Sequence, residues 1–245
     1  MAVDGGCLTF CKLVYNSIAK GRECAYNKLE IFEIVRLELL METLEFILVI
    51  IAAYVMGSLS ISIFMSSHVL GRDIRRAGSG NAGATNMARV YGMSAGVLTL
   101  GGDMCKTAAA MLLGYLVLGD RGMAAAGMAC MAGHCYPLLH GFKGGKGVSA
   151  GAAIALCIDW RAGLLTIAVF AIAALCSKKV SFGSICAALS LPVWALVLEL
   201  SQPRCALAIV GMCLVVIRHR ENIKRLISGT EPDFKPGKSK RIERD

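Results

Sequence analysis

Residues 148–176 read VSAGAAIALCIDWRAGLLTIAVFAIAALC, an apolar stretch interrupted once, at Asp159-Trp160-Arg161. The interruption leaves apolar pieces of 11 and 15 residues. At about 1.5 Å per residue, neither piece alone crosses a hydrocarbon core of about 30 Å. The stretch is either one span with a costly break or two short helices that turn at Asp159, and the choice sets the topology of the rest of the chain.

The composition places the chain in a membrane. Of its 245 residues, 56% are hydrophobic and 18% are charged, and the mean hydropathy is +0.62. A soluble domain of this length could not bury so much apolar surface. Five further apolar stretches approach the length of about 20 residues that a span needs: 44–65, 93–117, 122–141, 182–200 and 204–217.

The distribution of Lys and Arg chooses between the two topologies, because basic loops stay preferentially on the cytoplasmic side. If 148–176 crosses once, the basic tail after residue 217 lies opposite the loop that carries Arg72, Arg75, Arg76 and Arg89. If it forms two short helices, the other face keeps only Arg121, Arg161 and Arg204. We therefore predict an all-α integral membrane protein with about seven transmembrane helices, two of them short, the N-terminus outside and the C-terminus cytoplasmic.

Residues 1–42 fit this pattern poorly. They alternate charge and apolarity without the continuous apolar core of a signal peptide. The amphipathic run from Ile31 to Leu40 favours an interfacial helix, and the alternative is a mis-assigned start with the native start at Met41. The rest of the chain divides into a membrane domain over 43–232 and a basic cytoplasmic tail over 233–245.

Charge and cysteine usage exclude several function classes. The chain has 26 Lys+Arg and 17 Asp+Glu, and most of the basic residues lie in loops on one predicted face. This distribution indicates which face is cytoplasmic, and it favours anionic lipids or phosphates as partners. We therefore expect no binding of nucleic acid. The 11 cysteines include no CxxC pair and lie mostly inside apolar segments. They are typical of small buried hydrophobic residues, so we expect neither a disulfide framework nor a metal site, and no cofactor.

The first polar loop, residues 77–89, reads AGSGNAGATNMAR. The glycines Gly78, Gly80 and Gly83 permit backbone turns that aim N–H groups at an anion. Donors on the side chains accompany them: Ser79, Asn81, Thr85, Asn86 and the forked guanidinium of Arg89. This composition favours a phosphate site. The plainer interpretation is a glycine-rich turn between helices with a chance Arg.

The second loop, residues 141–147, reads GFKGGKG and combines glycines (Gly144, Gly145, Gly147) with Lys143 and Lys146. It is not a Walker A loop, because position 140 is His and Gly147 stands where Ser or Thr would bind magnesium. It is a second candidate phosphate loop or a basic loop that only sets topology. His134, just upstream, is either a site residue or a helix-end His satisfied by the backbone.

The third cluster, residues 218–225, reads RHRENIKR at the end of the last apolar stretch. His219 and Asn222 are three residues apart and share a helix face, so both can face one pocket, and Glu221 joins them as a candidate. We interpret Arg220, Lys224 and Arg225 as anchors that reach the membrane boundary. An even number of predicted crossings separates the three loops, so all three should meet at one face.

Asp103 and Lys106 are three residues apart inside the stretch 93–117. Ionisable groups at membrane depth are costly and are usually paired or functional. We expect this pair to orient the polar loops or to line the site, with a purely structural role as the alternative.

Taken together, these motifs closely resemble the acyl-phosphate:glycerol-3-phosphate acyltransferase family (PlsY). The resemblance covers residues 50–232 through four stretches: AYVMGS at 53–58, DIR at 73–75 followed by GSGNAGATN at 78–86, GHCYP at 133–137 followed by FKGGKGV at 142–148, and RHRENIKR at 218–225 followed by GTE at 229–231. The order and the spacing of these motifs both agree with the pattern of the family. Ser60 and Thr107 depart from the family's usual Pro and Gly, and residues 1–42 have no counterpart.

The resemblance implies transfer of a fatty acyl group from acyl phosphate to the 1-hydroxyl of glycerol 3-phosphate, giving lysophosphatidic acid and phosphate. It implies the catalytic residues Ser79, Arg89, Lys146, His219 and Asn222, and the substrate-binding residues Gly80, Asn81, Gly83, Thr85, Asn86, His134, Lys143, Gly144, Gly145, Gly147 and Glu221. The base for the hydroxyl proton is His219 or a phosphate oxygen of the substrate. Because acyl phosphate is already activated, positioning and charge neutralisation matter more than a covalent nucleophile.

The expected setting is a bacterial cytoplasmic membrane, with a multi-pass chain, the active site on the cytoplasmic face, and membrane lipids and the acyl-phosphate-producing enzyme as partners. Two alternatives remain open at this stage. His68 and Asp73 match the HX4D dyad of another acyltransferase class. A transporter of an anionic solute could use the same loops as a gate, although the chain has no internal repeat.

Overall fold

The structure is a computed structural model that describes residues 28–237, so predictions for residues 1–27 and 238–245 lie outside it. Within the described range the chain is helical and has no strand. The helices are α2 (Lys28–Ser58), α3 (Ile61–Phe64), η1 (Met65–Val69), η2 (Ile74–Arg76), α4 (Ala84–Tyr91), α5 (Met93–Cys135), η3 (Leu138–His140), α6 (Val148–Ile158), α7 (Trp160–Ser177), α8 (Val180–Val197), α9 (Gln202–Arg218) and α10 (Arg220–Ile227).

Four helical regions are long and apolar enough to span a membrane: Phe32–Val69, Met93–His140, Trp160–Ser177 and Val180–Val197. The helix α6, with 11 residues, is a shorter apolar helix. The expected all-α membrane class is therefore confirmed. The count of seven spans and the orientation of the termini stay predictions.

The break at Asp159 has a local cause. Asp159 adopts an extended backbone (φ −166°, ψ 127°) that ends α6, and its carboxylate accepts hydrogen bonds from the amides of Arg161 (2.8 Å) and Ala162 (3.3 Å) at the start of α7. An Asp at this position satisfies amides that a helix start leaves without partners. At the end of α6, Arg204 donates to the carbonyl of Ile158 (2.7 Å). The prediction of two helices that turn at Asp159 is confirmed.

The element α5 is a hairpin of two helical arms. Leu118 (φ −133°) and Gly119 (φ 57°) leave helical geometry, which separates the two apolar stretches expected at 93–117 and 122–141. The two arms lie very close, because a Cβ on Gly114 would lie 2.3 Å from the carbonyl oxygen of Gly122. Small residues allow this approach between helix backbones.

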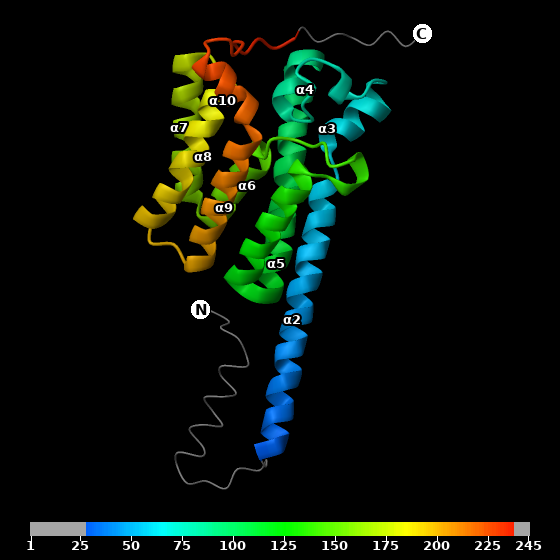
Figure 1. Cartoon of the computed structure of the whole chain (residues 1–245), viewed down its shortest axis with the longest axis vertical. Helices are drawn as coiled ribbons and strands as arrows, with labels where there is room; N and C mark the ends of the chain where they lie inside the picture. Colours follow the sequence, from blue (N-terminus) through cyan, green and yellow to red (C-terminus); the bar gives the residue numbers. More distant parts are fainter. Residues whose placement is uncertain (1–27, 238–245) are drawn as a thin grey trace.

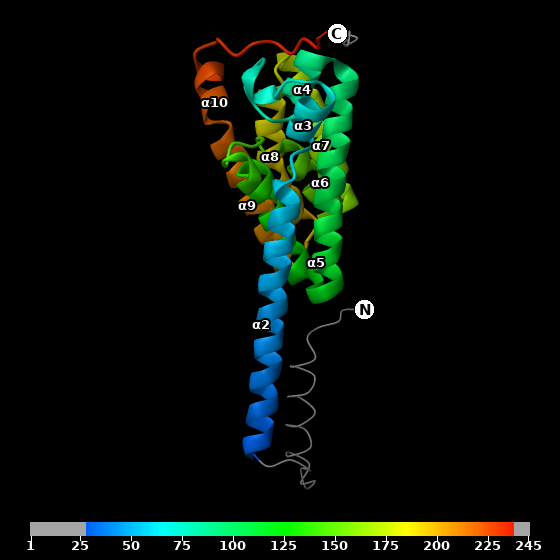
Figure 2. The same cartoon turned by 90° about the vertical axis from the view of Figure 1, so that its right-hand side faces the viewer.

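The helix α2 packs along the second arm of α5 in the same manner. A Cβ on Gly57 would lie 2.1 Å from the carbonyl oxygen of Cys130, and one on Gly133 would lie 2.3 Å from that of Tyr54. The helix runs without a break from Lys28, so residue 42 is no boundary of secondary structure. Its first half projects beyond the other helices (Figures 1 and 2).

The largest apolar core lies between both arms of α5 and helices α6 to α9. Its largest buried side chains are Met111, Met131, Ile154, Ile158 and Leu207. At one end of this bundle lie α3, α4, α10 and the chain that follows α10, whereas α2 begins far beyond the opposite end (Figures 1 and 2). The polar loops around α4 and α10 therefore share one end of the molecule, as the sequence predicted.

Candidate functional site

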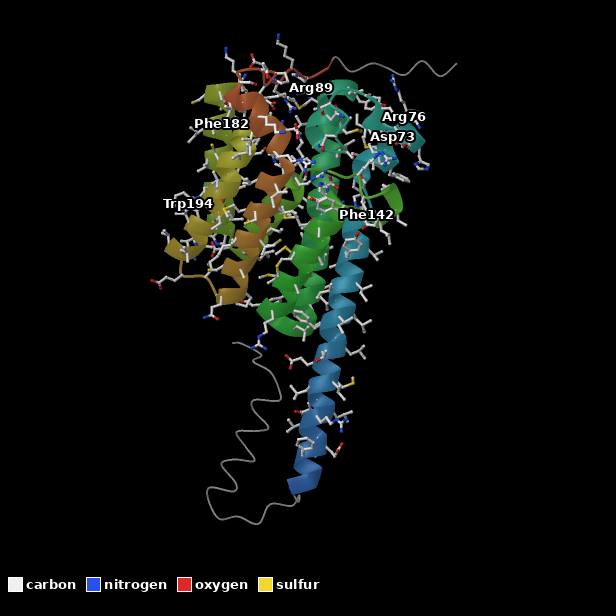
Figure 3. The ribbon with its side chains drawn as sticks, in the orientation of Figure 1. Asp73, Arg76, Arg89, Phe142, Phe182 and Trp194 are labelled. Carbon is white, nitrogen blue, oxygen red and sulfur yellow. The ribbon has the colours of Figure 1, made fainter. Side chains whose placement is uncertain are left out.

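A cavity of about 1010 Å³ opens among these loops. Its polar part is lined by the loop before α4, the turn before α6, and residues of α10 and of the chain that follows it. The expected site residues in its wall are Ser79, Gly80, Asn81, Gly83, Thr85, Asn86, Arg89, His134, Lys143, Gly144, Lys146, His219, Glu221 and Asn222. Figure 3 shows Arg89 at this end of the molecule. Segments far apart in sequence thus form one site.

Asn86 organises the first loop from within. Its side chain accepts a hydrogen bond from the amide of Ser79 (2.9 Å) and donates to the carbonyls of Ala77 and Asn81 (3.0 Å each) and of Ile74 (3.3 Å). It is buried, with 1% of its surface exposed. Because these bonds occupy both ends of its amide, Asn86 shapes the loop.

The loop needs glycine at positions 78 and 80 for conformational reasons, and at position 78 for a steric reason as well. Gly78 and Gly80 have positive φ (59° and 71°), a region that side chains disfavour. A Cβ on Gly78 would also lie 2.3 Å from the Asn86 amide oxygen. The loop then enters α4 at Gly83, so the start of α4 and its positive dipole end lie in the cavity wall near Thr85.

The second loop lies directly against His134. Cβ atoms on Gly144 and Gly145 would lie 2.1 Å from the carbonyl oxygen and from Nε2 of His134, respectively. Arg218 donates to the carbonyls of Gly145 (3.1 Å) and Gly144 (3.2 Å) and lies over the ring of Tyr136. Gly145 and Gly147 do not line the cavity. Gly147 has φ 82° and directly precedes α6. Gly145 and Gly147 therefore determine the backbone conformation of the loop.

Lys146 points from this loop toward α10. Its ammonium donates a hydrogen bond to the amide oxygen of Asn222 (2.5 Å). Burial, together with the positive charges of Arg225, Arg218 and Arg89, lowers its pKa to about 8. Lys146 is therefore mostly charged near pH 7 but unusually easy to deprotonate.

His219 lies beside Lys146 at the junction of α9 and α10. Its Nδ1 donates to the carbonyl of Val215 (2.8 Å), because a carbonyl can only accept, and this tautomer leaves Nε2 as an acceptor. The pKa of His219 is lowered to about 4, and burial is the main cause. The ring is neutral near pH 7, and it is only 2% exposed.

Glu231 completes the polar network, and the sequence analysis missed its place in the site. Its carboxylate accepts hydrogen bonds of 2.6 Å from Asn222, Ser181 and Arg225. Burial raises its pKa, but these donors outweigh burial, so its pKa lies below the usual value. The interpretation of Arg225 as a membrane anchor is wrong, because its guanidinium bonds Glu231 in the wall of the cavity. The GTE motif at 229–231 was the available signal.

Asp103, Lys106 and His134 form a buried cluster that connects the two arms of α5. The ammonium of Lys106 lies 2.7 Å from Asp103 Oδ1 and donates to the carbonyls of Leu59 (2.6 Å) and Gly57 (3.1 Å) at the end of α2. His134 Nδ1 lies 3.6 Å from the same carboxylate oxygen. Because His134 also lies directly beneath Gly145, the cluster supports the second loop.

The HX4D pair is not arranged as a catalytic dyad. His68 stacks on Phe64 and contacts its carbonyl, whereas Asp73 pairs with Arg75 at 2.7 Å. Hydrogen bonds from Arg75 hold the pKa of Asp73 below its usual value. Arg75 also donates to the carbonyl of His140 (2.9 Å), so Asp73 helps join the first and second loops. Neither His68 nor Asp73 lines the cavity.

The deeper part of the cavity is apolar. Leu100 and Met104 of α5 lie on one side, and the others come from α6 to α9: Ile154, Ile167, Phe170, Ala187, Ala188, Leu191 and Met212. None of these apolar residues could be singled out from the sequence, because nothing in a membrane helix marks which apolar side chains face a cavity. One cavity thus offers a basic end and an apolar end.

The family model described as "Glycerol-3-phosphate acyltransferase" matches residues 47–229. A glycerol-3-phosphate acyltransferase of Syntrophotalea carbinolica is 40% identical over 192 residues, covering 78% of this chain and 98% of that protein. One of Geobacter sulfurreducens is 37% identical over 184 residues, covering 75% and 94%.

Two crystal structures of PlsY, described as an integral membrane glycerol 3-phosphate acyltransferase, have the same fold. The glycerol 3-phosphate form has a TM-score of 0.74 at 33% identity and covers 78% of this chain and 96% of that one. The lysophosphatidic acid form has a TM-score of 0.72 at 32% identity, with coverage of 78% and 95%.

Proposed function

This chain belongs to the glycerol-3-phosphate acyltransferase family, and on that basis we propose that it transfers a fatty acyl group from acyl phosphate to the 1-hydroxyl of glycerol 3-phosphate. The products are lysophosphatidic acid and phosphate. The family match confirms the resemblance seen in the motifs. The observation that carries the reaction is the single cavity in which a basic, glycine-rich end continues into an apolar end.

The polar end suits two phosphate groups. Arg89 of α4 and Lys146 of the turn before α6 both line this end and supply positive charge, and Ser79 adds a hydroxyl beside the start of α4. Charged donors held in a partly buried site stabilise developing negative charge far better than water does. We assign Arg89, Lys146 and Ser79 to phosphate binding and to neutralising the leaving phosphate. The apolar end then receives the acyl chain.

His219 and Asn222 lie where the acceptor hydroxyl would approach. The Nε2 of neutral His219 can accept the hydroxyl proton in a hydrogen bond, whereas Asn222 holds Lys146 in place. With a pKa of about 4, His219 is a weaker base than a phosphate monoester, whose second pKa is about 6. We therefore propose that a substrate phosphate oxygen takes the proton and that His219 orients the hydroxyl.

In this reaction the acceptor oxygen attacks the acyl carbonyl carbon, the bond between that carbon and the phosphate oxygen breaks, and inorganic phosphate leaves. The leaving group is good, so the site gains most of its rate by holding the two substrates together. Glu231 supports this arrangement through Asn222 and Ser181.

We further propose that the chain crosses the membrane seven times, through α2, the two arms of α5, and α6 to α9, with the site on the cytoplasmic face of a bacterial inner membrane. The positive charge of the loops at the site end supports this orientation. The enzyme that makes acyl phosphate is then the expected supplier of the donor.

The decisive assay offers purified protein acyl phosphate, acyl-CoA or acyl carrier protein separately, with labelled glycerol 3-phosphate. Lysophosphatidic acid should form with acyl phosphate. Equal turnover with acyl-CoA would contradict the proposed donor. Counterflow of glycerol 3-phosphate in proteoliposomes, without acyl transfer, would favour a transporter instead.

A further inference from the structure

The chain that follows α10 runs across the open end of the cavity. Residues 232–237, which we call the strap, leave the α10 side of the molecule and reach the end of α4, as two perpendicular views show (Figures 1 and 2). They form no regular secondary structure. Pro232 and Phe234 line the cavity, so the strap is part of its wall.

The strap is attached to both sides of the cavity. The amide of Phe234 donates to the carbonyl of Lys178, in the turn between α7 and α8 (3.0 Å), and the amide of Gly237 donates to the carbonyl of Ala88 in α4 (3.0 Å). Lys179 adds an ion pair with Asp233 (3.0 Å). The strap therefore connects the turn between α7 and α8 directly to α4.

The attachment at α4 lies beside a site residue. A Cβ on Gly237 would lie 2.4 Å from the carbonyl oxygen of Arg89, so only glycine fits there without a shift of backbone. Arg89 is in the last turn of α4, a helix of eight residues, and its side chain lines the cavity. The position of the strap and the position of Arg89 are thus coupled.

The strap lies outside residues 47–229, the part of the chain that the family model matches. The motifs that predict the phosphate site do not include it.

We propose that the strap covers the polar end of the site, holds Arg89 in the cavity wall that it shares with Lys146 and keeps water from the acyl donor; this rests on the proposed acyl transfer. Acyl phosphate is a mixed anhydride, so water competes with the acceptor hydroxyl. When water attacks the acyl carbon, the bond to the phosphate oxygen breaks, phosphate leaves with one proton of the water, and a free fatty acid remains. Closing a site against water suppresses such side reactions.

Two shortened chains separate the strap from the residues beyond it. A chain that ends at Pro232 lacks the strap contacts, and a chain that ends at Gly237 keeps them. Both are purified in membrane-mimetic form, and lysophosphatidic acid and free fatty acid are measured over a range of glycerol 3-phosphate. For the chain ending at Pro232 we expect a rise in KM of about tenfold or more, because a misplaced binding group is costly, and a several-fold rise in free fatty acid per ester formed. The chain ending at Gly237 should match the full chain.

Gly237→Ala tests the same contact with one methyl group, and Gly101→Ala is its control because a Cβ there meets no atom within 4 Å. Gly237→Ala should shift both quantities in the same direction, whereas Gly101→Ala should shift neither. Hydrogen exchange should show faster exchange of the backbone amides of residues 234 and 237 in Gly237→Ala, and no change at either amide in Gly101→Ala. That readout does not need acyl transfer, so it tests the contacts even if the full chain proves inactive and the proposed function fails.

Unchanged KM and unchanged fatty acid release in the chain ending at Pro232 would overturn the proposal. An equal change in the chain ending at Gly237 would also overturn it, because the effect would then belong to residues beyond the strap. A fall in kcat alone, with KM and the product ratio constant, would reduce the strap to a structural role.

Discussion

The ammonium of Lys146 donates a hydrogen bond of 2.5 Å to the amide oxygen of Asn222, across 76 residues of sequence. This contact joins the glycine-rich loop before α6 to α10, and Asn222 continues it to Glu231. One side of the polar site is therefore a connected network, in which a change at one residue alters the position of the next.

Removing a cation from the site should nearly abolish acyl transfer. Lys146→Ala and Arg89→Ala should each lower the rate by roughly two or more orders of magnitude, because a donor that acts on developing charge contributes about 3–4 kcal/mol. The rate of lysophosphatidic acid formation measures this, alongside membrane yield. His68→Ala should stay active because His68 lies outside the cavity. Normal turnover in Lys146→Ala together with an inactive His68→Ala would favour the HX4D dyad.

The pH dependence should report the ammonium of Lys146. Its pKa in the ligand-free protein is lowered to about 8, so the charged form dominates below that pH and is lost as the pH rises through it. The value of kcat/KM for glycerol 3-phosphate, which reports the free enzyme, should therefore fall above about pH 8. Lys146→Arg keeps its charge at these pH values and should flatten this limb, whatever its absolute rate. A limb that persists unchanged in Lys146→Arg belongs to another group.

Gly144→Ala should inactivate the enzyme without disturbing membrane insertion. The new Cβ would lie 2.1 Å from the carbonyl oxygen of His134, so the turn that precedes Lys146 must shift. We expect a loss of activity of about a hundredfold, the scale of a displacement of about 1 Å at a reacting centre. Gly101→Ala is the matched control and should behave as the unmodified chain. Full activity of Gly144→Ala would show that the turn can relax at no cost to the site.

Cysteine labelling tests the topology. Reagents applied from outside should reach positions near Asp120, Asp159 and Gln202, whereas positions near Gly80, Gly145 and Lys178 should react only from inside. The native cysteines are first replaced by Ala or Ser in an active background. External labelling at Lys178 would mean that 148–176 crosses the membrane once, and the shared cytoplasmic site would then be wrong.

A chain that begins at Met41 should insert and remain active. It keeps the buried part of α2, including Ala53 and Gly57, and the ion pair between Glu42 and Arg121. The residues of α2 that it removes are largely exposed, as Phe32 (64%) and Leu37 (62%) are. It also avoids exporting the five basic residues before Met41. Membrane yield and activity measure this, with mass analysis of the native N-terminus. Loss of either in the shorter chain would assign the extension to the working enzyme.

Much of this architecture could be predicted from local sequence. Apolar length predicts membrane helices, and the charged interruption at Asp159 predicts the turn between α6 and α7, because an Asp there caps a helix start. Glycines beside Lys146 and Arg89 predict anion loops, because only glycine reaches the required backbone geometry at low cost. These signals involve neighbouring residues, so no knowledge of the fold is needed.

Other features exist only in the folded chain. The sequence does not indicate that Asn86 turns inward to hold its own loop, that Glu231 collects Asn222, Ser181 and Arg225, or that residue 237 lies against Arg89. Two of these contacts depend on a partner brought close by helix packing, because Ser181 lies 50 residues from Glu231 and Arg89 lies 148 residues from Gly237. Sequence alone determined the helices and the chemistry of the loops, because those follow from local length, charge and backbone freedom. Tertiary structure decided which donors meet which acceptors, because hydrogen bonds depend on distances that only packing sets.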